Sequence, residues 1–175
     1  MDSEFRGFSK IARLSKDMII TEKIDGTNAC IFIGESGEFK VGKRTQWITP
    51  QNDNYGFAAW AYEHEQELKG LPIGFNYGEW YGSGIQRRYG LTEKRFALFN
   101  VSIPIVPICC SIVPVLYGGI FDTEKIEKCL HNLKIHGSYA APGFMNPEGV
   151  VVWHSGARIC FKKTFIDIGK EEHGI

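Results

Sequence analysis

The sequence predicts an α+β fold in which antiparallel sheets carry helices on their outer faces. Three observations support this prediction. Most apolar segments are short or alternate with a period of two, which is typical of strands. Two segments repeat apolar residues with helical spacing. A turn signal at Glu35-Ser36-Gly37 joins two neighbouring strand segments, which favours a hairpin and therefore antiparallel pairing.

The expected strands run from residue 18 to residue 165. Met18–Ile24 is predicted to be a strand that enters a sharp turn at Asp25-Gly26. Ala29–Gly34 and Glu38–Arg44 form the expected hairpin. The other expected strands are Phe75–Trp80, Phe96–Ile103, Ile112–Tyr117, Val150–His154 and Arg158–Phe165.

The first expected helix spans residues 57–68 and presents one apolar face. That face consists of Phe57, Trp60, Ala61, His64 and Leu68. Asn52 or Asp53 is a candidate cap at its start, and Gly70 ends the apolar run. Because His64 shares the apolar face, we expect it to be a packed core or boundary residue without a chemical role.

The second expected helix carries an apolar stripe from Ile126 to Leu133. Asp122 or Thr123 is suited to begin it, because short polar side chains satisfy the first backbone N–H groups. Gly137 is suited to end it, because glycine readily adopts the conformation that stops a helix.

Composition indicates an ordinary globular protein. Hydrophobic residues make up 43% of the 175 residues, which fits one domain covering residues 1–175. The longest apolar stretch, Val101–Leu116, contains three prolines and is not a membrane span. Met1–Lys10 lacks the apolar core of a signal peptide, so we expect a cytoplasmic protein.

The formal net charge is zero, so the chain as a whole has no long-range attraction for a phosphate backbone. Local basic patches are present at Lys40–Arg44, Gln86–Arg88 and Lys162-Lys163. Charge clusters of this kind are more often solvated surface than binding sites, so they decide nothing alone.

The five cysteines follow no repeated spacing, which argues against a disulfide framework. Adjacent cysteines on a strand point to opposite faces, so Cys109 and Cys110 are a poor metal-binding pair. We expect buried small hydrophobic residues in a reducing compartment. The five are Cys30, Cys109, Cys110, Cys129 and Cys160.

The most informative stretch is Thr21–Thr27, where Lys23 ends an apolar strand before a glycine turn. This position puts an amine at the lip of a cleft, and a lysine amine in its neutral form is a good nucleophile. The Lys-x-Asp-Gly pattern is common, however, and a surface lysine beside a turn is an equally simple interpretation.

Three further segments place polar or aromatic groups at strand positions. Glu79 lies between Gly78 and aromatic residues, where a carboxylate can accept hydrogen bonds from ribose hydroxyls. Phe99 is suited to the core or to stacking on a base. Glu148 precedes an apolar strand, and hard carboxylate oxygens suit magnesium or manganese beside phosphates.

The last segment is an apolar strand that ends in Lys162 and Lys163, which are suited to neutralising phosphate oxygens. Neighbouring residues of a strand point to opposite faces, so only one of the two lysines can face a cleft. We favour Lys162, because it is in phase with Cys160 and opposite to Phe161.

In order and spacing, these segments resemble the motif series I, Ia, III, IIIa, IV and V of the covalent nucleotidyltransferase superfamily. That superfamily contains DNA ligases, RNA ligases and mRNA capping enzymes. The Thr21–Gly26 segment looks most like the first motif of the RNA ligase 2 family, and the resemblance extends from Ile19 to Phe165. It implies an ATP-grasp-like ligase adenylation domain.

The resemblance also implies residue roles. Lys23 matches the lysine that attacks the α-phosphorus of ATP and forms lysyl-AMP. The other matches are Glu22 to the residue at the adenine edge, Arg44 to the motif Ia arginine on the ribose and phosphate side, Glu79 to the ribose carboxylate, Phe99 to the aromatic ring on adenine, Glu148 to the carboxylate that supports the metal, and Lys162 or Lys163 to the motif V lysine at the α-phosphate.

The implied function is that of an ATP-dependent RNA ligase that uses Mg²⁺ or Mn²⁺. AMP would pass from Lys23 to an RNA 5′-phosphate, and a 3′-hydroxyl would then displace AMP and seal the strand. The implied partners are RNA ends, including nicked duplex, with the protein as a monomer. Ligases of this superfamily generally carry a further domain after motif V, so self-adenylylation is better supported by this sequence than strand sealing.

Other functions stay open at the level of sequence. Within the superfamily, a DNA ligase core or a GTP-using capping guanylyltransferase would present the same motifs. A nucleotide- or RNA-binding module that no longer turns over would keep the fold, and a plain structural domain is the remaining alternative. The presence of Lys23, Glu79, Glu148 and Lys162 together argues against loss of activity.

Overall fold

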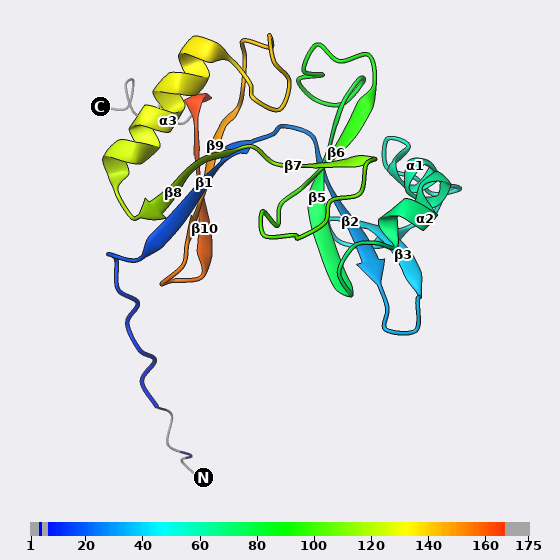
Figure 1. Ribbon diagram of the computed structural model, residues 1–175, viewed down its shortest axis with the longest axis horizontal. Coiled ribbons are helices and arrows are strands. Elements are labelled where there is room, and N and C mark those ends of the chain that lie inside the picture. The colour runs from blue at the N-terminus through cyan, green and yellow to red at the C-terminus, as the bar shows by residue number, and fades with distance from the viewer. Residues whose placement is uncertain (1–3, 5–6, 167–175) are drawn as a thin grey trace.

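The computed structural model describes residue 4 and residues 7–166, and its ten strands in that part form two sheets (Figure 1). The four-stranded sheet has the order β10 (Ile159–Thr164), β9 (Gly149–His154), β1 (Asp17–Lys23) and β8 (Val115–Ile120). The six-stranded sheet has the order β4 (Trp47–Ile48), β3 (Phe39–Lys43), β2 (Thr27–Ile33), β5 (Gly74–Gly82), β6 (Lys94–Leu98) and β7 (Cys110–Ile112).

Helix α3 (Thr123–His136) covers the outer face of the four-stranded sheet (Figure 1). The Asp122 side chain accepts a hydrogen bond from the Glu124 backbone N–H, and Gly137 caps the other end with a positive φ. Both termini were therefore predicted correctly. Leu133 and its neighbours pack against alternate residues of β1 and β9, including Ile20 and Val152, to form a closed core.

Helices α1 (Phe57–Glu63) and α2 (Glu65–Leu68) cover the outer face of the six-stranded sheet (Figure 1). Alternate residues of β2, such as Ile31, point toward these helices and pack around Phe57 and Trp80. Each sheet therefore buries its outer face under helices, which leaves the inner faces turned toward each other.

The chain crosses from one sheet to the other directly after β1. Gly26 lies at this crossing, and a Cβ atom there would come within 2.3 Å of the Trp80 carbonyl oxygen. A side chain at this position would therefore displace backbone. The crossing leaves Lys23, the last residue of β1, between the two sheets.

Several sequence predictions differ from the structure. The segment Ile112–Tyr117 is not one strand, because Pro114 lacks an N–H donor and separates β7 from β8, which lie in different sheets. The strand expected at Phe96–Ile103 ends at Leu98, where an Asn100 side chain accepts from the Ser102 backbone in a turn. β6 and β7 pair in parallel, although antiparallel pairing was expected throughout.

The first expected helix is interrupted at His64, where it divides into α1 and α2; together these two helices cover the expected range apart from His64 itself. The His64 ring lies against the Trp60 ring, and its Nδ1 is 2.9 Å from the Trp60 carbonyl oxygen. The N-cap residue of α1 is Gly56, so the expectation of Asn52 or Asp53 at that position is wrong. Asp53 still satisfies the start of the helix from outside it, because its carboxylate accepts from the backbone N–H groups of Ala58 and Ala59.

All five cysteines are free thiols, as expected without a disulfide framework. The expectation of burial holds for Cys30 and Cys129 but is wrong for Cys160, which lies exposed near the start of edge strand β10. Among the described residues no helix is long and apolar enough to cross a membrane. Much of Met1–Lys10, and both ends of the domain predicted over residues 1–175, lie outside the described residues.

We predict that Leu133→Ala lowers the free energy of unfolding by about 2–5 kcal/mol, because it leaves a cavity between α3 and the sheet. Leu133 is fully buried, whereas Ile135 on the same helix is 52% exposed. The control variant Ile135→Ala should therefore lose less than about 1 kcal/mol. Equilibrium urea unfolding measures both, and equal losses would contradict the assignment of this core.

Candidate active site

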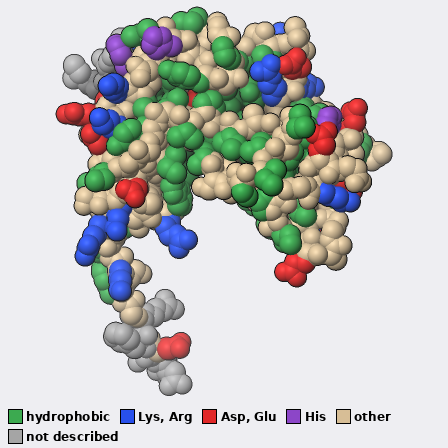
Figure 2. Space-filling view, viewed as in Figure 1, with side chains coloured by type: hydrophobic (Ala, Val, Ile, Leu, Met, Phe, Trp, Pro, Cys, Tyr) green, Lys and Arg blue, Asp and Glu red, His purple; other side chains and the backbone are tan. Residues whose placement is uncertain are grey.

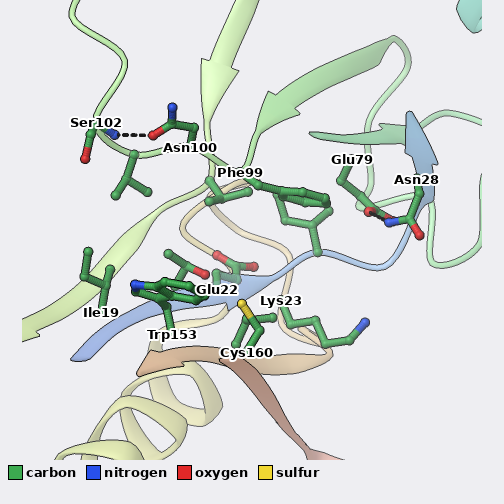
Figure 3. Close-up of a pocket in the computed structure, with 15 residues that line it drawn as sticks. Ile19, Glu22, Lys23, Asn28, Glu79, Phe99, Asn100, Ser102, Trp153 and Cys160 are labelled. Atoms are coloured by element: carbon green, nitrogen blue, oxygen red, sulfur yellow. Dashed lines mark hydrogen bonds between the residues drawn. The ribbon is translucent and has the colours of Figure 1, made fainter. Parts of the chain in front are cut away.

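A cavity of about 550 Å³ lies between the inner faces of the two sheets. Its volume falls within the range of about 300–1,000 Å³ that small-molecule sites occupy. Figure 2 shows hydrophobic side chains on both sides of the hollow between the two halves of the molecule. One wall comes from β1, β9 and β10, and the other comes from β2, β5 and the segment after β6 (Figure 3).

Lys23 meets Glu148 at one end of this cavity. Its Nζ donates a hydrogen bond to Glu148 Oε2 at 2.6 Å, and both side chains are largely buried. The sheet register explains the pair, because Lys23 lies directly opposite Gly149 on β9 and Glu148 precedes that glycine. Two residues that are 125 positions apart in sequence therefore form one ion pair.

Glu79 lies on the opposite wall, near Asn28 (Figure 3). Its carboxylate accepts from the Gly26 backbone N–H at 2.9 Å and from Asn28 Nδ2 at 3.1 Å. The residue is only 7% exposed, and burial raises the pKa of the Glu79 carboxyl to about 7 against the opposing effect of these donors and Lys23. This carboxyl therefore changes charge near neutral pH.

Glu22 lines the cavity but directs its carboxylate away from Lys23. Oε1 accepts from the Ser138 hydroxyl at 2.5 Å, and Oε2 accepts from the backbone N–H groups of Tyr139 and Ala140. Burial raises the pKa of the Glu22 carboxyl, while these three donors favour its charged form. The carboxylate thus ties β1 to the segment that follows α3.

The turn after Lys23 is held by the loop between β5 and β6, and this contact was not predicted from the sequence. The Asp25 backbone N–H donates to the Tyr89 hydroxyl at 2.7 Å, and Arg87 Nε donates to Asp25 Oδ2 at 2.8 Å. Tyr89 is buried and has a positive φ, a conformation that sequence patterns do not reveal for tyrosine. These two contacts fix the direction in which the chain leaves Lys23.

The middle of the cavity has apolar walls that suit a flat ring. Phe99, 43% exposed, lies on one wall, while Val151 and Trp153 of β9 lie on the other. Sequence reasoning missed both Trp153 and Asn28 as site residues. The alternation of β9 could have identified Trp153, since period two places it on the same face as Val151.

The two lysines of β10 point to opposite faces of the four-stranded sheet. Lys162 pairs with Val151, so it shares the face that lines the cavity and has the phase expected from the sequence. Lys162 itself is exposed and lies beyond the lining residues. Lys163 is on the helix side, where its Nζ donates to Glu127 Oε1 of α3 at 2.7 Å.

Arg44 is not brought into the main cavity. With Lys43 it lines a neighbouring cavity of about 510 Å³ on the same sheet face. The two cavities share Asn28, Phe99 and Asn100, so they adjoin.

A divalent cation at Glu148 would need further oxygen ligands, which a bound nucleotide and water would supply. In the described part of the chain, no three acidic, cysteine or histidine side chains form a metal-binding group. Magnesium in nucleotide sites is usually held by one or two carboxylates together with phosphate oxygens and water. Glu148, with Oε2 bonded to Lys23, fits that mode of binding.

The sequence model of the family described as RNA ligase matches residues 16–166. No curated protein matches the chain. Several solved structures share the fold, and the examples below are all mutants of the Naegleria gruberi RNA ligase.

A form with ATP and Mn aligns at a TM-score of 0.63 and 17% identity, covering 91% of this chain and 53% of that chain. A form with AMP and Mn gives a TM-score of 0.58 at 17% identity, covering 90% and 52%. An apo form gives 0.59 at 17% identity, covering 93% and 53%. The present chain thus spans about half the length of these structures, and the likeness shows the fold.

We predict that Glu79 makes the folded protein less stable as pH rises from about 5 to 8. Its carboxyl has a raised pKa of about 7 when folded and an ordinary value of 4.5, so the folded state binds more protons between these values. The stabilising contribution is complete below pH 4.5 and is lost as pH passes 7. Glu79→Gln lacks this titration.

Melting temperatures of both proteins between pH 5 and 8 check this. The difference, variant minus wild type, should grow steadily with pH, because all other groups titrate alike in both proteins. A difference that does not change with pH would show that Glu79 keeps an ordinary pKa.

Proposed function

This chain belongs to the RNA ligase family, and we propose that it is an ATP-dependent RNA ligase that forms lysyl-AMP on Lys23. The observation that carries the proposal is the Lys23 amine, held by Glu148 at the end of a cavity whose opposite wall carries a buried carboxylate, Glu79. An amine nucleophile beside a cavity of nucleotide size is what adenylyl transfer requires.

The cavity suits an adenine nucleotide. Phe99 and Trp153 line opposite walls of the cavity, and we infer that a base stacks on one or both of these rings. Glu79 would accept hydrogen bonds from the ribose hydroxyls, and Arg44 would reach the ribose and phosphates from the neighbouring cavity. Glu22 keeps one acceptor position beyond its three donors, which suits the amino group of adenine.

In the proposed reaction, the Lys23 Nζ forms a bond to the α-phosphorus while the bond from that phosphorus to the pyrophosphate oxygen breaks. Pyrophosphate leaves with the electron pair. The amine must lose its proton to attack, and Glu148 Oε2 at 2.6 Å is an acceptor within reach. Lys162 would neutralise the developing charge on the α-phosphate, because it extends from the cavity face of β10.

Glu148 has a second proposed role, in binding Mg²⁺ or Mn²⁺. Glu148 would hold the divalent cation, which would supply positive charge that stabilises the leaving group. Forms of the Naegleria gruberi enzyme with ATP or AMP and Mn support this choice of nucleotide and metal.

The later steps follow from the chemistry of lysyl-AMP. An RNA 5′-phosphate oxygen would attack the phosphorus of lysyl-AMP, and the Lys23 amine would leave. A 3′-hydroxyl would then attack the 5′-phosphorus and release AMP. We propose RNA ends, including nicked duplex, as the substrates of a monomer that works in the cytoplasm.

We predict that the protein incubated with ATP and Mg²⁺ gains the mass of one AMP, and that Lys23→Ala gains none. Lys128→Ala is the control, because Lys128 is an exposed lysine on outer helix α3. Intact mass spectrometry measures the adduct, and a parallel incubation with GTP distinguishes a guanylyltransferase. Retained label in Lys23→Ala would exclude Lys23 as the nucleophile.

We predict that Lys162→Ala slows adduct formation by roughly a hundredfold or more, since it removes a cation that stabilises phosphate charge. Lys163→Ala is the matched neighbour, and its effect should be small because Lys163 pairs with Glu127 on the helix side. Single-turnover rates with labelled ATP check both variants. The reverse order of effects would assign the phosphate contact to Lys163.

A further inference from the structure

Four aromatic side chains form a cluster on the inner face of the six-stranded sheet. We call Phe32, Trp47, Phe75 and Tyr77 the aromatic face. The Phe75 and Tyr77 rings lie 5.8 Å apart with planes inclined by 6°, and the Trp47 and Phe75 rings lie 5.9 Å apart at 14°. Trp47, Phe75 and Tyr77 are 46%, 55% and 55% exposed. Contiguous exposed rings of this kind mark interaction sites, whereas single exposed apolar residues scattered over a surface do not.

The sheet register builds this surface. Phe75, Tyr77 and Glu79 alternate along one side of β5, so the aromatic face begins directly beside the carboxylate proposed for ribose. Trp47 lies opposite Gly42 of β3, and a Cβ on Gly42 would come within 3.3 Å of the indole ring. The absence of a side chain at Gly42 lets the indole lie low enough to stack on Phe75.

The aromatic face does not serve the core. The opposite side of the same strands, with Ile31 and Trp80, already packs against α1 and α2. The aromatic face is therefore not needed to form the core, and its rings stay open to a ligand on the inner face of the sheet.

Positive charge surrounds these rings. Lys40 Nζ lies 5.7 Å from the centre of the Trp47 ring and also pairs with Glu38 at the sheet edge. Lys43 and Arg44 line the second cavity together with Phe75 and Tyr77. Within residues 7–166, no carboxylate lies at ion-pair distance from Lys43 or Arg44. Their charge is thus available to a phosphate group.

We propose that the aromatic face, with Lys40, Lys43 and Arg44, binds a single-stranded segment of RNA next to the ends being joined. Stacked aromatic rings beside cations bind unpaired bases without a demand for sequence, because every base has a ring face. The second cavity shares Asn28 and Phe99 with the nucleotide cavity, so the strand passes from the nucleotide toward Trp47 over one continuous surface. The choice of a polynucleotide as ligand rests on the proposed function.

The test uses the full chain and a fluorescein-labelled single-stranded oligoribonucleotide of mixed sequence. We expect Phe75→Ala and Tyr77→Ala each to weaken binding about tenfold, as loss of one stacking ring does. Tyr77→Phe keeps the ring and should bind like wild type. Tyr62→Ala is the control, because Tyr62 is an exposed ring on helix α1, over the other side of the sheet. Lys40→Gln should reduce the slope of log affinity against log salt by about 0.7.

A strand of the same length without bases separates stacking from charge. Wild type should bind it more weakly than Tyr77→Ala binds RNA, because a strand without bases loses stacking on every ring and not on one. Adduct formation with ATP should stay at the wild-type rate in the ring variants, and it reports the proposed function separately, because RNA binding is measured without ATP.

Equal RNA affinity of wild type, Phe75→Ala and Tyr77→Ala would overturn the inference, as would equal binding of the strand without bases. Sedimentation that shows a dimer in wild type and monomers in the ring variants would assign the face to a second copy of the chain instead. If wild type forms no AMP adduct with ATP, the proposed function is overturned, and this result does not depend on the measured RNA affinities.

Discussion

The crossing at Gly26 is the constraint on which the other features of the site depend. Consecutive strands β1 and β2 belong to different sheets, and the chain between them passes so close to the Trp80 carbonyl oxygen that a Cβ has no room. Contacts on three sides secure this crossing. The Gly26 N–H donates to Glu79, the Asp25 N–H donates to Tyr89, and Glu22 accepts from the segment after α3. Lys23 is therefore fixed between two walls that belong to different parts of the sequence.

Burial of carboxylates gives the site its electrostatic character. Each carboxylate costs free energy to take out of water unless donors compensate it. Glu22 has three donors, Glu79 has two, and Glu148 has the Lys23 ammonium. The three carboxylates therefore differ in how many acceptor positions remain for a ligand. Burial raises the pKa of both the Glu22 and the Glu79 carboxyl, to about 7 for Glu79. Glu22 uses three acceptor positions to hold the fold, whereas Glu79 accepts from two donors and keeps more room for a donor from a ligand.

The sequence was sufficient for the elements and residues that depend on local patterns. The α3 caps, the β2–β3 hairpin and the phase of Lys162 all follow from the spacing of neighbouring residues. Sheet membership is not local, and it could not be predicted from the sequence: Pro114 separates two strands that look like one, and the second of them joins β1. The Tyr89 contact with Asp25 was missed for the same reason, because the partners are 64 positions apart in sequence and no spacing rule connects them.

Strand β5 shows how one segment serves two surfaces. Period two places Phe75, Tyr77 and Glu79 on the inner face, while Trp80 packs in the core under the helices. Gly78 also points to the core side, where a Cβ would meet the Phe96 ring at 2.5 Å, so this position has to stay small. A one-residue shift of β5 against β2 would bury the three inner residues and expose the core set. The hydrophobic core therefore fixes the register, and the register in turn keeps the open rings in line with the carboxylate of the nucleotide cavity.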